Sequence, residues 1–175
     1  MADSNTTKKA LASTLKDLME SKPFEKISVG DICEKCNMNR KSFYYHFKDK
    51  YDLVNWIFDT EFSEIVYKKT YEDEWDFLND ICQFFYDNRT FYRKALRIKG
   101  QNSFSDHFRT LLQIAISNRL QEVFHIKEAE EFPIVFLADA FVMAFHRWIL
   151  EYNSMTPSEF IEQIKTSIKY LATSL

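Results

Sequence analysis

Two cationic side chains are followed by two aromatic ones within residues 40–45, and this combination suits the recognition of nucleic acid. Arg40 and Lys41 are consecutive, and either can donate hydrogen bonds to O6 and N7 of guanine in the major groove of DNA. Tyr44 follows one helical turn later and can reach a thymine methyl group or a phosphate, with Tyr45 beside it. We therefore expect these residues to contact a DNA duplex.

The element that precedes this stretch begins at Ser28 and carries the signals of a short helix. Ser28 is a favourable N-cap, and Asp31 three residues later completes a capping-box-like pair. The apolar residues then recur at helical spacing, at Val29, Ile32, Cys33 and Cys36. The free N–H groups at the start of this helix would place Ser28 at a phosphate, and Gly30 would let the backbone come close to DNA.

A turn and a second short helix follow. Asn37 tolerates the left-handed conformation that a helix end requires, and Asn39 can cap the next helix. Phe43 and Phe47 are four residues apart and should point inward together, which leaves the cations and tyrosines outside. The pattern predicts a helix-turn-helix with a basic recognition helix, from which Ser42 should also contact DNA. The alternative, a helix pair packed inside a larger bundle, would not need these exposed side chains.

The block SVGDICEKCNMNRKSFYYHFKDKYDL closely resembles the N-terminal signature of TetR-family transcriptional regulators. In that family a T/S-V-x-D-I element leads through a turn to T/S-F-Y-x-H/Y-F and then to K-x-x-L. Asn37 stands where glycine is usual and Cys33 where alanine is usual, and both departures are sterically mild. The resemblance implies binding to double-stranded DNA at a palindromic operator, with His46 and Lys50 along the DNA backbone.

The composition favours an all-α protein. The chain has 175 residues, of which 46% are hydrophobic and 17% aromatic, but only two glycines and three prolines, too few turn residues for a sheet protein. Residues 1–50 carry ten lysines and arginines against seven acidic residues, and the remainder is acidic. We predict a helix-turn-helix domain over residues 1–49 and a helical regulatory and dimerisation domain over residues 50–175.

Three cysteines without a signal peptide or a long apolar run fit a reduced, cytoplasmic protein. The spacing Cys33-x-x-Cys36 can hold zinc or carry out thiol exchange, but a structural zinc site needs a second ligand pair, which the sequence lacks. Both cysteines also fall on an apolar helix face, so we expect them to pack in the core and expect no metal.

Periodicity and capping residues predict the remaining helices. The first spans residues 6–21, and a long one runs from Asp49 to Tyr67 directly out of the DNA-reading segment. The later helices are expected at residues 73–88, 90–99, 103–124, 130–152 and 157–174.

The last two helices predict a homodimer. Residues 134–150 are apolar almost all round, so this helix must be covered on most sides. A membrane span is the rival interpretation, but the uninterrupted apolar stretch is short and contains Asp139. In the TetR family the last two long helices pair with their copies in a four-helix interface. We expect this interface to contain Phe141, Phe145, Trp148, Ile164 and Ile168.

The sequence carries no phosphate-binding glycine loop, metal-ligand cluster or nucleophile motif, so we expect neither an enzyme nor a cofactor. Asp139 and His146 are seven residues apart on one helix face and could line an effector pocket with Met143. The alternative is that they make satisfied contacts in the core or at the dimer interface. Single buried polar residues in a helix more often do so.

The body of the chain resembles the TetR-like regulators of dihydroxyacetone kinase operons in its shortness and in its aromatic residues around positions 84–92. That resemblance implies control of genes for dihydroxyacetone use, with the signal supplied by a dihydroxyacetone-kinase-like coregulator protein. A repressor of another operon that responds to a small-molecule effector is the second hypothesis. A helical protein-interaction module that does not bind DNA is a third, from another class.

Overall fold

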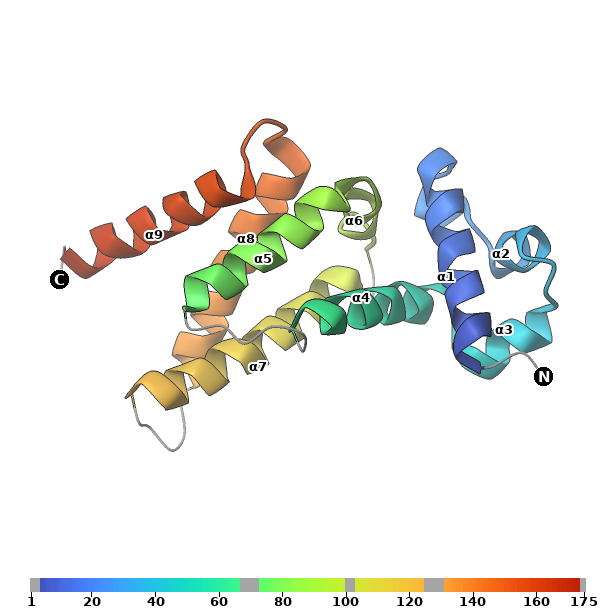
Figure 1. Ribbon diagram of the computed structural model, residues 1–175, viewed down its shortest axis with the longest axis horizontal. Coiled ribbons are helices and arrows are strands. Elements are labelled where there is room, and N and C mark those ends of the chain that lie inside the picture. The colour runs from blue at the N-terminus through green and yellow to red at the C-terminus, as the bar shows by residue number, and fades with distance from the viewer. Residues whose placement is uncertain (1–3, 67–72, 100–102, 125–130, 174–175) are drawn as a thin grey trace.

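The computed structural model describes residues 4–66, 73–99, 103–124 and 131–173, and these ranges contain helices and no strand. Figure 1 shows an elongated molecule with a small N-terminal group of helices at one end and a larger helical body at the other. The helices are α1 (Ser4–Ser21), α2 (Val29–Lys35), α3 (Arg40–His46), α4 (Lys50–Val66), α5 (Glu74–Asp87), α6 (Arg89–Ala95), α7 (Phe104–Phe124), α8 (Glu131–Glu151) and α9 (Pro157–Thr173).

Helices α1 to α3 form the N-terminal domain around one apolar core. Helix α1 places its leucines at helical spacing on one face, and both α2 and α3 pack against that face. The 3-10 turn Phe24–Lys26 lies between α1 and α2 in the chain and buries Phe24. The buried side chains of this domain are Leu11, Leu15, Leu18, Met19, Phe24, Ile27, Ile32, Cys33, Phe43 and Phe47. These residues hold α2 and α3 at a defined angle, as a helix-turn-helix requires.

Helix α4 belongs to both ends of the molecule (Figure 1). It contacts α1 in the N-terminal domain and α5 and α7 in the body. Leu53, Val54, Ile57 and Phe58 are all buried, and they join the two regions into one continuous apolar core. Helix α4 is therefore shared by the N-terminal domain and the body.

Aromatic rings fill the centre of the body. Phe58 of α4 lies 5.2 Å from Phe104 and 5.9 Å from Phe108, both on α7, measured between ring centroids. Phe85 of α5 lies 4.7 Å from Phe145 of α8. These rings are 0–2% exposed and meet mostly edge to face, the geometry that the quadrupole of aromatic rings favours. The space between α4, α5, α7 and α8 is thus occupied by side chains.

Within the described residues, the helices that were predicted from periodicity are confirmed, with one clear difference at α6. The predicted helix ends at Tyr67 and at residues 130 and 174 lie outside the described residues. Helix α6 was expected to continue to residue 99 but ends at Ala95. The chain then continues with 3-10-type hydrogen bonds, because the N–H groups of Arg97 and Ile98 donate to the carbonyls three residues earlier. The side chains of Leu96 and Ile98 are buried in this turn.

The side chains that the last two helices expose are only partly those that were predicted. Helix α9 lies along α5, and Phe160 stacks on Trp148 of α8 with ring centroids 4.7 Å apart. Phe145 and Trp148, both predicted as dimer contacts, are 0% and 1% exposed within the single chain. That prediction was wrong for these two residues, because their side of α8 packs into the body's own aromatic core. Of the other three, Phe141 and Ile164 are half-buried and Ile168 is exposed.

The outer side of α8 is instead exposed and apolar. Phe132, Phe136 and Met143 are 78%, 56% and 67% exposed, and the rings of the two phenylalanines stack with centroids 6.4 Å apart. Among the described helices, α8 has the length and composition of a membrane span. Its inner side, however, packs on α7 and in the core, so its apolar character reflects burial on that side.

Candidate nucleic-acid interface

A reciprocal capping box starts α2 and holds its first turn. The Asp31 N–H donates to the Ser28 hydroxyl oxygen over 3.1 Å, and the Ser28 N–H donates back to the Asp31 carboxylate over 2.7 Å. The Ser28 hydroxyl also donates to that carboxylate, over 2.6 Å. These side-chain and backbone hydrogen bonds lower the pKa of Asp31 from 3.8 to about 2. The capping box predicted from sequence is therefore present, and the hydroxyl proton of Ser28 is directed to Asp31.

The turn between α2 and α3 is closed by two asparagines. Asn37 has a φ of 53°, the left-handed conformation that was expected of it. The next residue is hydrogen-bonded to α2, since the Met38 N–H donates to the Cys33 carbonyl over 2.8 Å. The side chain of Asn39 then accepts a hydrogen bond from the Ser42 N–H over 2.8 Å and caps α3. The turn thus sets the direction in which α3 leaves α2.

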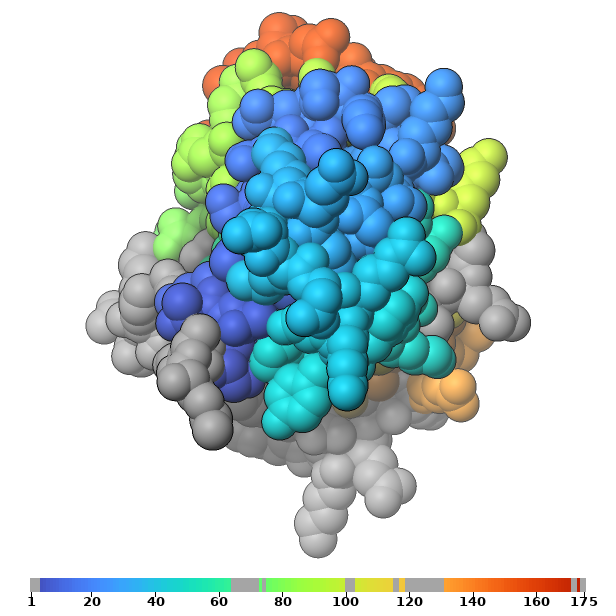
Figure 2. Space-filling model, turned by 90° about the vertical axis from the view of Figure 1, so that its right-hand side faces the viewer, coloured from blue at the N-terminus to red at the C-terminus, as the bar shows by residue number. Residues whose placement is uncertain are grey.

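Helix α3 has a buried side and an exposed basic side. Phe43 and Phe47 are 0% and 3% exposed, with ring centroids 5.8 Å apart, as their spacing predicted. Tyr44 and Tyr45 are 57% and 83% exposed, and Arg40 and Lys41 are exposed beside them. Figure 2 views the molecule from this end and shows the segment of α2 and α3 at the surface nearest the viewer.

Arg40 and Gly30 lie against each other across the two helices. A Cβ atom built on Gly30 would lie 2.6 Å from one terminal nitrogen of the Arg40 guanidinium. The glycine was expected to let DNA approach the backbone. In this structure the space that it leaves open is taken by Arg40.

Lys50 makes different contacts from the phosphate contact that was predicted for it. Its ammonium group donates to the carbonyl oxygens of Phe24, Glu25 and Ile27 over 2.8, 3.4 and 2.7 Å. It also lies 4.3 Å from the centroid of the Phe24 ring. Burial lowers its pKa, opposed by the charges of Glu25 and Asp31. All three donors are used within the protein, so Lys50 acts here as a structural residue.

His46 ends α3 in a half-exposed position. Its ring meets the ring of Tyr45 edge to face with centroids 4.9 Å apart, and the centroid of the Phe47 ring lies 6.4 Å away. The imidazole is therefore at the rim of the exposed face of α3, next to the tyrosine that stands out furthest. A contact from His46 to the DNA backbone stays a prediction.

The two cysteines of α2 pack as apolar residues. Cys33 is buried and Cys36 is half-buried, and the Cys36 thiol donates to the Cys33 carbonyl over 3.6 Å. Burial raises the pKa of Cys33 and the neighbouring Cys36 raises it further, while the charge of Arg40 opposes both. Within the described ranges, no three His, Cys, Asp or Glu side chains are grouped as metal ligands.

The three residues predicted for an effector pocket have three different surroundings. Asp139 pairs with Arg109 of α7 over 3.1 Å, and His146 shares a hydrogen bond of 2.8 Å with the Ser105 hydroxyl. Met143 is exposed on the outer side of α8. Burial lowers the pKa of His146. The two polar residues thus tie α8 to α7, and the alternative interpretation as satisfied helix contacts describes them better.

A group of contacts between the N-terminal domain and the body was missed by the sequence analysis. Lys16 of α1 pairs with Glu61 of α4 over 2.6 Å, and Glu61 also accepts a hydrogen bond of 3.2 Å from the Tyr92 hydroxyl. Lys94 of α6 donates to the carbonyls of Met19 and Glu20 at the end of α1, the latter over 2.8 Å. These partners lie 31 to 75 residues apart along the chain, so local patterns carry no signal of them.

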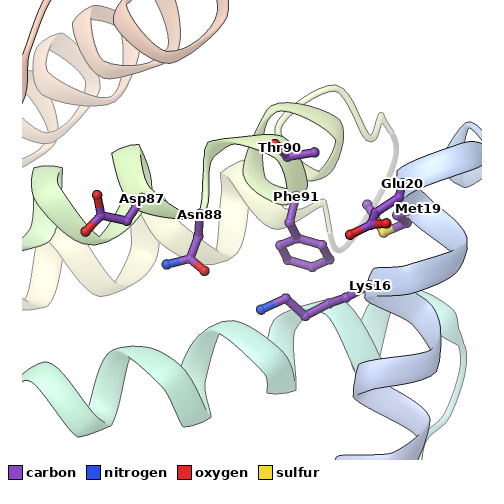
Figure 3. A pocket seen from close by; sticks show the side chains of 7 residues that line it. All are labelled: Lys16, Met19, Glu20, Asp87, Asn88, Thr90 and Phe91. Atoms are coloured by element: carbon purple, nitrogen blue, oxygen red, sulfur yellow. The ribbon is translucent and has the colours of Figure 1, made fainter.

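These contacts border an open hollow of about 180 Å³ between α1 and the junction of α5 and α6. Figure 3 shows Lys16 and Glu20 of α1 on one side of it and Phe91 of α6 on the other. The Lys16 ammonium lies 5.3 Å from the centroid of the Phe91 ring. The N-terminal domain is therefore attached to the body through α6 as well as through α4.

A capped helix-turn-helix with an exposed basic recognition helix, joined to a helical body, defines a DNA-binding transcriptional regulator. Residues 11–57 match the model of the bacterial regulatory proteins of the tetR family. Residues 73–170, more than half of the chain, match a TetR-type transcriptional regulator C-terminal region. The chain belongs to the TetR family of transcriptional regulators, as its sequence resemblance predicted.

Individual relatives agree with this assignment. The HTH-type dhaKLM operon transcriptional activator DhaS of Lactococcus lactis subsp. lactis (strain IL1403) is 32% identical over 101 residues. That match covers 56% of this chain and spans about half, 53%, of the length of that relative. A solved structure of the dihydroxyacetone kinase operon activator DhaS is 25% identical, with a TM-score of 0.65, over 94% of this chain and 97% of that one. A TetR transcriptional regulator from Streptococcus agalactiae 2603V, 22% identical, shares the fold with a TM-score of 0.74 over 94% of both chains.

Proposed function

We propose that this TetR-family chain controls a dihydroxyacetone kinase operon by binding, as a homodimer, to a palindromic site on double-stranded DNA. The observation that supports the base-reading role is the exposed side of α3, which presents Arg40, Lys41 and Tyr44 to solvent. In this proposal Arg40 and Lys41 donate to guanine in the major groove. Further contacts to the duplex come from Ser28, Ser42, Tyr45 and His46.

The base-reading role is tested with Arg40→Ala. The operator is first obtained by selecting randomised duplexes with the wild-type protein, and a scrambled duplex serves for comparison. We expect Arg40→Ala to weaken operator binding by about 1–3 kcal/mol while binding to the scrambled duplex changes less. Lys9→Ala removes one exposed charge from α1 and is the control. Unchanged discrimination in Arg40→Ala would exclude the base contact.

The operon is proposed from the relatives. The DhaS structure matches this chain over nearly its full length, body included, and the Lactococcus relative is described as an activator of dhaKLM. The aromatic body residues that carried the sequence resemblance form the central core, including Phe85, Phe91 and Tyr92. Transcription of dihydroxyacetone kinase genes should therefore change in a deletion strain. The alternative is a TetR-type repressor of another operon, which the same transcript measurement would reveal.

A protein coregulator is a better fit to the body than a buried small molecule. A small-molecule site is usually an enclosed apolar cavity, whereas the centre of this body is filled by rings that touch one another. The pocket predicted around His146 opens to solvent and does not include Asp139 or Met143. We therefore propose that a dihydroxyacetone-kinase-like protein supplies the signal.

Calorimetry of the purified protein separates the two kinds of signal. We expect no heat of binding with dihydroxyacetone alone and clear binding with the kinase-like protein, accompanied by a change in DNA affinity of roughly 1–3 kcal/mol. Because the coupling is reciprocal, DNA should change the affinity for the coregulator by the same factor. Tight binding of dihydroxyacetone alone would exclude the protein coregulator as the required signal.

The homodimer is proposed to form through the exposed outer side of α8 together with Ile168 of α9. A two-fold pair would set two copies of α3 about one DNA turn, ~34–36 Å, apart, as a palindromic operator requires. We propose a regulatory rather than an enzymatic role and a cytoplasmic location, which the three free cysteines support.

A further inference from the structure

Gly30 of α2 lies against the guanidinium of Arg40. A Cβ atom at residue 30 would lie 2.6 Å from Arg40 Nη2, 3.4 Å from Arg40 Cζ and 3.3 Å from Ser28 Oγ. The first of these distances is well inside van der Waals contact. The guanidinium therefore rests in the space that any other side chain at residue 30 would fill.

The guanidinium that rests there is free to bind a ligand. Arg40 is exposed, and among the residues that the structure describes it has no hydrogen-bond acceptor and no acidic partner. Its Nη2 lies closest to the glycine, at a point where the backbone presents no side chain. This contact narrows the directions in which a long side chain can extend, and a pre-positioned guanidinium loses less conformational entropy when it forms a bidentate pair.

We infer that Gly30 is a positioning residue for Arg40: it allows the guanidinium to lie over the start of α2 and so sets which base edge Arg40 reads. This inference rests on the proposed base-reading role of Arg40. The ligand is the pair of acceptors that a guanine presents in the major groove, O6 and N7. A larger residue at position 30 turns Arg40 away from this direction and relaxes specificity at one base pair in each half-site.

A competing role for Gly30 predicts a different outcome. If the glycine serves to let a DNA phosphate approach the α2 backbone, an added methyl group collides with the DNA itself. The loss of affinity would then be the same for every sequence and would not depend on Arg40. Substitution of both residues, singly and together, separates the two roles.

The experiment uses the full-length chain with Gly30→Ala, Arg40→Ala and the double variant. Each is titrated against the duplex selected by the wild-type protein and against duplexes with single base-pair changes. We expect Gly30→Ala to reduce discrimination at one position of each half-site by roughly tenfold, the same position at which Arg40→Ala loses it. In the Arg40→Ala background, Gly30→Ala should have no further effect.

A change in DNA binding by Gly30→Ala is not expected to come from misfolding. Alanine is the better helix former, so Gly30→Ala should leave the melting temperature unchanged or higher, and the displaced group is the end of a flexible side chain. An equal loss in both backgrounds, or full discrimination in Gly30→Ala, overturns the inference while the base-reading role of Arg40 stands. Full discrimination in Arg40→Ala overturns both.

Discussion

Lys16 of α1 and Glu61 of α4 form an ion pair of 2.6 Å that joins the N-terminal domain to the helix that enters the body. The same carboxylate accepts a hydrogen bond from Tyr92 of α6, and Lys94 of α6 binds the carbonyl end of α1. Three helices from both ends of the molecule thus meet at one point. Because α4 and α6 both contact α1, we expect movement of the body to change the orientation of α1 and, through the shared core, that of α3.

We predict that Glu61→Gln weakens the link between body and DNA-binding domain with little effect on stability. The side chains of Lys16 and Glu61 are 29% and 32% exposed, so the pair should contribute less than about 1 kcal/mol. Amide hydrogen exchange in α6 should slow when the wild-type protein binds its operator, and this response should shrink in Glu61→Gln.

The pair between Lys35 and Asp17 provides the control for Glu61→Gln. It joins α2 to α1 wholly inside the N-terminal domain, at 3.6 Å. Asp17→Asn removes a similar charge and should leave the α6 response intact. An unchanged response in Glu61→Gln would show that this ion pair does not carry the coupling.

Lys50→Met should destabilise the N-terminal domain, in contrast to the DNA-backbone role predicted from sequence. The substitution leaves the carbonyls of Phe24, Glu25 and Ile27 without their donor, and we expect a loss of about 1–3 kcal/mol in the free energy of unfolding. Lys48→Met, at an exposed neighbour, is the control in chemical denaturation. If Lys50→Met instead keeps its stability and lowers the salt dependence of DNA binding by about one unit of slope, Lys50 contacts phosphate.

The capping box of α2 predicts a loss of stability in acid. The folded state holds the pKa of Asp31 at about 2, below its ordinary 3.8, so Asp31 binds its proton more weakly when folded. Its contribution is fully present above pH ~3.8 and is lost as pH falls toward about 2. Asp31→Asn should therefore be less stable than wild type at pH 5, and the difference should close near pH 2.

Denaturant unfolding at several pH values measures this difference for Asp31→Asn. Glu34→Gln removes an exposed carboxylate from the same helix without touching the cap, so its curve should run parallel to that of the wild type. If the difference in the free energy of unfolding between the wild type and Asp31→Asn stays constant from pH 5 to pH 2, the capping role is contradicted.

Phe136→Glu should separate the homodimer without unfolding the chain. Phe136 is 56% exposed on the outer side of α8, so a charge there is harmless in the single chain but is buried in the proposed interface. Sedimentation should show a monomer whose circular dichroism is unchanged and whose operator binding is weakened. A variant that stays dimeric would place the interface elsewhere.

Phe145→Ala supplies the matched contrast on the opposite side of α8. Phe145 is 0% exposed and lies against Phe85 and Phe108, so its truncation should cost about 3–5 kcal/mol of stability. If Phe145→Ala alters association but leaves stability intact, the original assignment of this residue to the dimer interface would be restored.

The elements of this fold follow from local sequence. Ser28 and Asp31 start α2 and Asn39 starts α3 through hydrogen bonds that span three residues, and Asn37 makes the left-handed turn between them. Such interactions depend only on neighbours in the chain, so the helix-turn-helix and the inward direction of Phe43 could be predicted. The match of this block to the TetR signature reflects the same local requirements.

The contacts between elements were decided by tertiary structure. A helix that is apolar all round does not reveal which side faces its own chain, so the burial of Phe145 and Trp148 and the exposure of Phe136 could not be assigned from periodicity. Lys50 was expected at DNA because the TetR resemblance implies a position along the DNA backbone, but carbonyls 23 to 26 residues earlier in the chain bind its ammonium. A long cationic side chain goes to whichever acceptors the fold brings within reach, and sequence alone does not say which these are.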